Sequence, residues 1–259
     1  MWQSKQYLNA VNQMKIVKTS EAGHKHGLKI LVHGPAGSGK TRLAATTGDL
    51  EHTLILSAEA GLLSLRGEDI DAVNITSIGS LREALVYIKR GLRGEKLEDG
   101  TTPKRYRWIM VDSVSEIAET LLAEGLKTAD DPRRAYGEMA DAVFKVVRAL
   151  RDLSGVNVVM TAKQARISDE GRLIYAPMFP GKQIEANISY LFDEVFAMRM
   201  APGKDGEPVR YLQCVGDGYY EAKDRSGALK VSEPANLAHI ADKIFAAGAV
   251  SAPAGDEES

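Results

Sequence analysis

The sequence predicts an α/β fold with a mostly parallel central sheet, flanked by helices and extended by antiparallel strands toward the C-terminal end. Three observations support this fold class. Apolar runs with almost no polar alternation, typical of parallel strands covered on both faces, occupy residues 28–33, 108–111 and 156–161. Segments with helical periodicity lie between these runs, which indicates a βαβα order. Turns rich in glycine and proline separate the last short strands, which indicates antiparallel connections.

Each element has its own signal. Residues 28–33, 53–57 and 73–77 are expected as the first three strands. A capping box formed by Ser80 and Glu83 predicts the start of a helix that ends at Gly94. Apolar residues from Met139 to Leu153 recur at helical spacing between the strands at 108–111 and 156–161. The remaining expected elements are a helix at 183–192, strands at 194–200, 210–214 and 219–222, and a closing helix at 234–247.

Composition limits the class of protein. The chain has 259 residues, 44% hydrophobic residues, 26% charged residues and a formal net charge of −2, which fits one globular core. We expect a short N-terminal segment (1–27), a core (28–247) and a disordered acidic tail (248–259). Cys214 is the single cysteine, which excludes internal disulfides and suits a reducing, cytoplasmic location. No apolar run is long enough for a membrane span, and we expect no secretory signal, because residues 1–18 lack an apolar region before a small-residue cleavage site.

A complete G-x-x-x-x-G-K-[ST] phosphate-binding loop, or P-loop, follows the first strand. Its glycines allow consecutive backbone N–H groups to face a polyphosphate, and the helix after it adds a positive N-terminal end. The lysine brings a cation to the β- and γ-phosphates, and the threonine hydroxyl is a ligand for Mg²⁺. The sequence therefore predicts an ATP and Mg²⁺ site at Gly34, Pro35, Ala36, Gly37, Ser38, Gly39, Lys40 and Thr41.

Two carboxylates can complete this site. Asp112 ends the apolar strand at 108–111, and we expect it to hold Mg²⁺ together with Thr41. Ser113 follows it, where many nucleoside triphosphatases have a glutamate that activates water. Glu59, two residues after the strand at 53–57, is the alternative base, because the carboxyl ends of parallel strands share one edge of the sheet.

These elements, in this order, resemble the RecA-like ATPase core over about residues 28–200. SAEAGLLSL (57–65) looks like the segment with the catalytic glutamate, and WIMVDSVSEI (108–117) looks like the Walker B strand. VNVVMTAKQARI (156–167) resembles the strand that leads to a γ-phosphate-sensing glutamine, here Gln164, or Lys163 if the alignment shifts by one. The small size and EAKDRSGAL near the end are similar to phage-encoded RecA-like single-strand annealing proteins.

The resemblance also implies an active site shared between subunits. Lys223 and Arg225 lie in K-x-R-x-G, which resembles the motif by which RadA-type and DnaB-type ATPases reach the γ-phosphate of a neighbouring subunit. A planar guanidinium there would neutralise charge in the transition state. Lys182 is a competing candidate, and an ordinary charged surface turn is the alternative explanation. We accordingly expect a homo-oligomer, as a ring or a filament.

In the RecA fold two loops face the axis of the assembly, and the corresponding segments are 127–136 and 165–182. From 163 to 182 there are four basic and two acidic residues, with aromatic residues among them. Single-stranded DNA is bound by this mixture of phosphate neutralisation and stacking. The candidate DNA-binding residues are Arg133, Arg134, Tyr136, Arg166, Arg172 and Lys182.

Together these features predict an ATPase that binds single-stranded DNA and promotes strand annealing in homologous recombination. Its expected location is the cytoplasm, or the host cytoplasm if the gene is phage-encoded, and a single-strand-binding protein is a candidate partner. Three other functions are also compatible with the P-loop. A ring translocase or helicase would use the same residues, a small-molecule kinase would not need Glu59, Lys223 or Arg225, and a nucleotide-gated scaffold would bind ATP and DNA with negligible turnover. DNA-stimulated ATP turnover and strand displacement would distinguish them.

Overall fold

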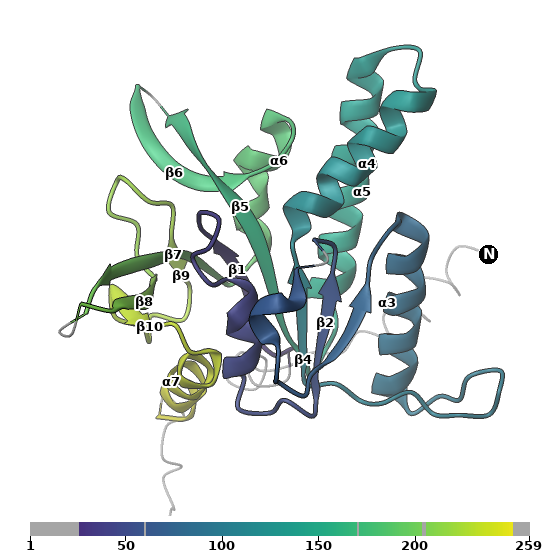
Figure 1. Cartoon of the computed structure of the whole chain (residues 1–259), viewed down its shortest axis with the longest axis horizontal. Helices are drawn as coiled ribbons and strands as arrows, with labels where there is room; N and C mark the ends of the chain where they lie inside the picture. Colours follow the sequence, from purple (N-terminus) through teal and green to yellow (C-terminus); the bar gives the residue numbers. More distant parts are fainter. Residues whose placement is uncertain (1–25, 60, 170, 204–205, 251–259) are drawn as a thin grey trace, which may run out of the picture.

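The computed structural model describes residues 26–59, 61–169, 171–203 and 206–250 of the chain, and it confirms the predicted fold class. A single sheet runs through the molecule in the order β10-β8-β7-β1-β5-β4-β2-β3, with β6 paired to β5 and β9 paired to β7 (Figure 1). The strands are β1 (Lys29–His33), β2 (Thr53–Ser57), β3 (Asp71–Asn74), β4 (Trp108–Asp112), β5 (Asn157–Asp169), β6 (Arg172–Met178), β7 (Glu194–Pro202), β8 (Pro208–Gln213), β9 (Lys223–Asp224) and β10 (Ser232–Pro234).

The helices alternate with these strands as expected for a doubly covered sheet. The α-helices are α3 (Ile78–Arg93), α4 (Val114–Thr128), α5 (Pro132–Arg151), α6 (Lys182–Asn187) and α7 (Leu237–Val250). Three short 3₁₀ helices are η1 (Thr41–Thr46), η2 (Leu62–Leu65) and η3 (Ile188–Leu191). The predicted helix after the P-loop is therefore the single 3₁₀ segment η1.

Strands β1, β2 and β4 are buried along their whole length, because they lie inside the parallel part of the sheet. Their register brings His33 opposite Ala162, and Ser57 opposite Asp112. The carboxyl ends of β1, β2, β4 and the first half of β5 therefore share one edge of the sheet. This edge is where side chains from distant parts of the sequence can converge on one ligand.

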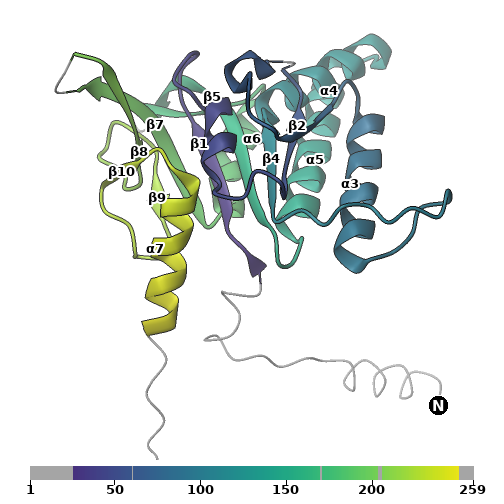
Figure 2. The same ribbon diagram turned by 60° about the horizontal axis from the view of Figure 1, so that its bottom comes forward.

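Two apolar clusters cover the two faces of the sheet. Helices α3, α4 and α5, with Ile184 of α6, pack on one face, and η1 and α7 pack on the other. Figure 2 shows α7 on one side of the sheet and α3, α4 and α5 on the other. Since both faces are covered, the central strands need apolar residues at successive positions, and the sequence supplies them.

Strand β3 and helix α3 begin at other residues than the sequence predicts. The third strand lies at Asp71–Asn74, earlier than 73–77, and α3 begins at Ile78 with Ser77 as its N-cap. The Ser77 hydroxyl accepts a hydrogen bond from the Ser80 N–H, and the Ser80 hydroxyl oxygen accepts one from the Ser77 N–H. Ser80 is therefore the third residue of a capping box instead of the cap itself. Gly94 ends the helix in the left-handed conformation, as predicted.

The C-terminal part is antiparallel, as expected, with one correction. Strands β7, β8 and β10 pair antiparallel, but residues 219–222 do not form a strand. Tyr220 makes only an isolated bridge to Tyr175 of β6, and β9 is the part of this segment that pairs with β7. Helix α7 continues through Val250, so the expected tail begins later than 248. The rest of the tail, and residues 1–25, lie outside the described residues.

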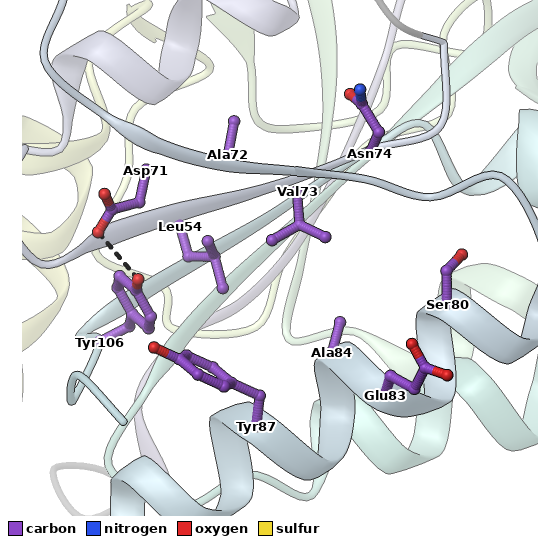
Figure 3. A pocket seen from close by; sticks show the side chains of 10 residues that line it. All are labelled: Leu54, Asp71, Ala72, Val73, Asn74, Ser80, Glu83, Ala84, Tyr87 and Tyr106. Atoms are coloured by element: carbon purple, nitrogen blue, oxygen red, sulfur yellow. Dashed lines mark hydrogen bonds between the residues drawn. The ribbon is translucent and has the colours of Figure 1, made fainter. Parts of the chain in front are cut away.

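A pocket of about 540 Å³ lies between the edge strand β3 and helix α3 (Figure 3). Its lining includes Val73 from β3 and Tyr87 from α3, and Asp71 accepts a hydrogen bond of 2.8 Å from the Tyr106 hydroxyl at one end. No residue of the P-loop lines it. This pocket is therefore separate from the predicted phosphate site. Across the described residues, we find no helix with the length and apolar character needed to cross a membrane.

Candidate functional site

The P-loop forms the turn between β1 and η1, at the carboxyl edge of the sheet. Gly37 and Gly39 have φ values of +74° and +101°, which residues with a side chain rarely adopt. The sequence thus places glycine at the positions where the loop reverses direction. The structure confirms that the motif follows a buried strand, which is the context that a P-loop requires.

Lys40 lies folded against its own loop. Its Nζ donates hydrogen bonds to the carbonyl oxygens of Gly34 (2.8 Å) and Pro35 (3.0 Å). Burial lowers the pKa of the Lys40 ammonium, and the nearby carboxylates of Asp112 and Glu59 oppose that shift. The cation is therefore placed between the loop and two carboxylates, as a phosphate-binding lysine requires.

Asp112 is the centre of the site. Its carboxylate is 2% exposed and accepts hydrogen bonds from the Thr41 hydroxyl (2.6 Å to Oδ2) and the Thr161 hydroxyl (2.5 Å to Oδ1). The first contact joins the two predicted Mg²⁺ ligands directly. Thr161 was not predicted; it lies opposite Asp112 because β4 and β5 are parallel neighbours, so only the strand order identifies it.

Glu59 reaches the same edge. The N–H groups of Ala58 and Glu59 donate to the Asp112 carbonyl oxygen at 2.7 and 3.3 Å, so the chain turns over the end of β4. The Ser113 hydroxyl donates to the Glu59 carboxylate at 2.5 Å. Ser113 therefore holds in place a carboxylate that comes from a different strand. Glu59 itself is exposed, so it is accessible to water.

The residues present fit a magnesium nucleotide. Thr41 and Asp112 offer a hydroxyl and a carboxylate oxygen, which are hard ligands that Mg²⁺ accepts together with phosphate oxygens. The Ser38 hydroxyl is buried in the loop without a hydrogen-bond partner in the described structure. Elsewhere in the described ranges no group of three or more His, Cys, Asp or Glu side chains is arranged to hold a metal ion. A bound metal would therefore depend on phosphate oxygens for most of its ligands.

Gln164 and His33 meet beside the P-loop. The Gln164 side-chain oxygen Oε1 lies 3.2 Å from His33 Nδ1, and His33 Nε2 lies 2.7 Å from the Glu221 carbonyl oxygen. Burial lowers the pKa of His33 to about 4, so its imidazole is neutral at neutral pH. The Glu221 carbonyl oxygen can only accept, so Nε2 is placed to donate to it. His33 was not predicted, because a histidine at the end of a strand has no distinctive sequence signal.

The Lys163 side chain contacts two carboxylates of helix α4. Its ammonium lies 2.8 Å from the Glu116 carboxylate and 2.7 Å from the Glu119 carboxylate of α4. Lys163 is therefore engaged in a local ion-pair network, and Gln164 is the member of this pair that contacts the strand before the P-loop. Gln164 as the γ-phosphate sensor stays a prediction.

Lys223 and Arg225 are not brought to the P-loop of their own chain. Lys223 Nζ donates to the carbonyl oxygens of Ser189 (2.8 Å) and Phe192 (2.6 Å), and Arg225 pairs with Asp193 at 3.0 Å. These contacts lie near the amino end of β7, which pairs with the start of β1, away from its carboxyl end.

Glu194 helps to fix the turn that carries Lys223 and Arg225. Burial, with the charge of Asp224 and a hydrogen bond to it, raises the pKa of the Glu194 carboxyl to about 8. Glu194 is therefore largely protonated at neutral pH and can share its proton with Asp224. The Asp224 carboxylate also accepts hydrogen bonds from the Ser226 hydroxyl and the Gly227 N–H, which holds the turn together.

The expected second loop, 165–182, is instead mostly an antiparallel hairpin of β5 and β6, followed by the start of α6. In this hairpin, residues 163–169 of β5 pair antiparallel with residues 172–178 of β6. It projects from the carboxyl edge of the sheet (Figure 1) and carries Arg166 and Arg172, both exposed. Phe179 is 4% exposed and belongs to the core, so it is unavailable for stacking.

The expected first loop, 127–136, is also largely helical. Helix α4 runs to Thr128 and α5 starts at Pro132, so Arg133, Arg134 and Tyr136 lie in the first turns of α5. Asp131 caps this helix and Pro132 occupies its first position, a combination that favours helix initiation. All three predicted residues are exposed, and Arg134 forms an ion pair with Glu138 (2.7 Å).

The two candidate DNA segments lie next to each other. A Cβ atom at Gly181 would lie 3.3 Å from the Tyr136 ring, so the start of α5 touches the residue before Lys182. Lys182 is exposed at the start of α6. Exposed basic side chains from α5 and α6 therefore lie near one another, beside the hairpin that carries Arg166 and Arg172.

A stack of arginine and tyrosine side chains fastens the hairpin to the C-terminal strands. The rings of Tyr175 and Tyr220 stack with centroids 4.7 Å apart. Arg166 lies 5.9 Å from the Tyr175 ring, and Arg199 lies 4.2 Å from the Tyr220 ring and 5.7 Å from that of Tyr211. This stack was not predicted, because its members are far apart in the sequence and each alone is unremarkable.

Comparison with known protein families gives a match to a family model described as an AAA domain, over residues 26–226. The match covers more than half of the chain and includes the P-loop, Asp112, the hairpin and Arg225. No curated protein matches the sequence.

Proposed function

Because this chain belongs to the AAA-domain family of P-loop ATPases, we propose that Mg-ATP bound at its P-loop controls its binding to single-stranded DNA. The observation that carries the proposal is the convergence of Thr41, Asp112 and Glu59 at one edge of the sheet, from which the basic hairpin also projects. We further propose that the DNA-bound protein anneals complementary strands in recombination. Base pairing supplies the free energy for annealing, so ATP would serve as a switch for assembly.

The residues of the site have distinct roles in this proposal. The glycine-rich loop and Lys40 would bind the phosphates, and Thr41 and Asp112 would hold Mg²⁺, which would neutralise charge at the phosphate oxygens. Glu59 accepts the proton of the attacking water, and Ser113 orients the Glu59 carboxylate through its hydrogen bond of 2.5 Å. Thr161 fixes the other oxygen of Asp112, so that one oxygen stays directed at Thr41.

We propose that the contact between Gln164 and His33 couples nucleotide binding to DNA binding. His33 directly precedes the P-loop, and Gln164 lies at the base of the hairpin that carries Arg166 and Arg172. A γ-phosphate that attracts the Gln164 amide would compete with His33 for it. ATP and its hydrolysis product would then favour different positions of the hairpin.

The experiment that tests this function is ATP turnover with and without a single-stranded oligonucleotide, on a sample sized by light scattering. We expect turnover that rises with the oligonucleotide and a particle larger than one chain. Turnover without any response to DNA would contradict the proposal and favour a small-molecule kinase. Unwinding of a forked duplex would favour a translocase, and DNA binding without turnover would favour a nucleotide-gated scaffold.

Replacing both Arg166 and Arg172 with alanine is expected to weaken binding of a fluorescent single-stranded oligonucleotide. Each lost phosphate contact removes about 0.7 from the slope of log K against log salt, so the salt dependence should also become flatter. Binding titrations at several salt concentrations measure both effects. Replacement of Arg148 and Arg151, at the end of α5 remote from the hairpin, is the matched control. Unaltered binding by the hairpin variant would place the DNA on another surface.

We also propose that the protein works as a homo-oligomer in which Lys223 and Arg225 complete the site of a neighbouring copy. Two features support this: both side chains lie away from the P-loop of their own chain, and Arg225 is exposed. Lys182, which is exposed at the start of α6, stays an alternative cation for the same role. The proposed location is the cytoplasm, and a single-strand-binding protein is a proposed partner in DNA delivery.

Arg225→Ala is expected to lower ATP turnover, and mixing it with Lys40→Ala should restore part of the activity. The two defects lie on opposite sides of one interface, so a mixed assembly contains some sites with both residues intact. Turnover measured across a series of mixing ratios tests this, with Arg151→Ala as the partner in a control series. Activity that never exceeds the sum of the separate variants would remove the shared site from the proposal.

A further inference from the structure

Arg210 of β8 lies against the P-loop, although it belongs to the antiparallel extension and is distant in the sequence. Its Nε donates a hydrogen bond of 3.1 Å to the carbonyl oxygen of Ser38, which lies 172 residues earlier in the sequence. A Cβ atom at Gly39 would lie 2.8 Å from the same Nε and 2.9 Å from Arg210 Cδ. The side chain of Arg210 therefore covers the Ser38–Gly39 peptide directly.

We infer that Arg210 is a positioning residue of the nucleotide site, which holds the Ser38–Gly39 peptide in the orientation that directs its N–H group to a bound phosphate. The inference rests on the nucleotide binding proposed above. The Ser38 carbonyl and the Gly39 N–H belong to one planar trans peptide and point in opposite directions. Fixing the carbonyl on the side of β8 therefore turns the N–H away from β8.

This peptide needs an external contact because its own sequence does not fix it. Gly39 has φ +101°, and glycine adopts positive and negative φ with similar ease, so the peptide before it can rotate at low cost. The Ser38 hydroxyl has no hydrogen-bond partner in the described structure and gives no anchor. Lys40 contacts the carbonyls of Gly34 and Pro35, at the other end of the loop.

The rest of the extension supports the same contact. Met198 of β7 packs beneath the loop: its carbonyl oxygen would lie 3.0 Å from a Cβ at Gly34, and its Cε would lie 3.4 Å from one at Gly39. Arg210 is paired with Met200 across β7 and β8, so the strand pair fixes where its side chain starts. The antiparallel strands thus give the P-loop a rigid support that a parallel core alone does not provide.

The test is the affinity of the full chain for Mg-ADP and Mg-ATP, measured by calorimetry for the wild type, Arg210→Met and Arg210→Lys. Arg210→Met retains an apolar side chain but has no donor, and we expect both nucleotides to bind about tenfold more weakly, the factor that corresponds to about 1.4 kcal/mol. Backbone N–H groups of the loop serve the α- and β-phosphates, so ADP and ATP should lose affinity equally. Arg210→Lys can still donate to the Ser38 carbonyl and should recover part of the loss.

Arg199→Met is the matched control, since it removes the same charge from the adjacent strand without touching the loop. Thermal unfolding of each variant shows whether it folds. Unchanged ADP affinity in that variant would overturn the inference, and so would a loss confined to ATP, which would indicate direct contact with the γ-phosphate. A lysine variant no better than methionine would also overturn it. A wild type that binds neither nucleotide would instead refute the proposed function.

Discussion

Replacing Glu59 with glutamine is expected to lower ATP turnover by about a hundredfold or more while Mg-ATP still binds. A general base contributes about 10²- to 10⁴-fold to a reaction of this kind, and the amide of glutamine cannot accept the proton of the attacking water. The change keeps the shape of the side chain and its ability to accept the Ser113 hydrogen bond. Single-turnover hydrolysis and nucleotide titration, measured on the same sample, separate catalysis from binding.

The matched control for this experiment is Glu51→Gln. Glu51 is an exposed carboxylate before the start of β2, at the opposite end of the strand that leads to Glu59. Its replacement should leave turnover unchanged. Ser113→Ala should produce an intermediate loss, because Glu59 stays present but is no longer oriented. A normal turnover in Glu59→Gln would show that water is activated by another group.

Replacing Lys40 with alanine is expected to weaken Mg-ATP binding by about a hundredfold and to abolish measurable turnover. Loss of one well-placed cationic or hydrogen-bond donor to a reacting group commonly costs 10²- to 10³-fold. Here the effect is increased because Asp112 and Glu59 would lose the cation that lies near both of them. Binding of a fluorescent nucleotide and steady-state turnover both measure the result.

Lys104→Ala provides the comparison for Lys40→Ala. Lys104 forms an ion pair of 2.9 Å with Asp71 on the surface, and such pairs contribute about 0–1 kcal/mol. Its loss should change neither nucleotide binding nor turnover. Undiminished turnover in Lys40→Ala would contradict the assignment of the phosphate site to residues 34–41. Thermal unfolding of both variants excludes a general loss of structure.

The sequence was sufficient to predict the fold class and to predict which candidate residues lie together at the carboxyl edge of the sheet. Strands β1, β2 and β4 are buried on both faces, and this requires apolar runs that can be recognised without any structure. The P-loop is recognisable because all of its parts lie within eight consecutive residues. Phosphate binding needs the backbone freedom of the glycines and the charge of the lysine, and the metal needs the hydroxyl oxygen of the threonine. Asp112 and Glu59 can then be predicted to lie near the P-loop, because parallel strands bring their carboxyl ends to one edge of the sheet.

The sequence did not predict the conformation of the two expected DNA loops. Residues 165–182 were expected to be irregular, but their pairing as β5 and β6 depends on contacts between strands that no short segment specifies. The start of α5 could have been recognised in the sequence, because Asp131 followed by Pro132 is a typical helix start. Both segments have exposed arginines. The proposed DNA-contacting residues are therefore the same, but they lie on a hairpin and a helix instead of on loops.

Residues that are close together in the chain or that follow the end of a strand could be predicted without a structure: the phosphate loop, the candidate metal ligands and the candidate base. Their contact partners became visible with the fold. Thr161 meets Asp112, His33 meets Gln164, and Arg210 meets Ser38 across strands that are adjacent in space but distant in sequence. The physical reason is that such a contact depends on strand order and register, which are set by packing of the whole sheet and leave no local pattern.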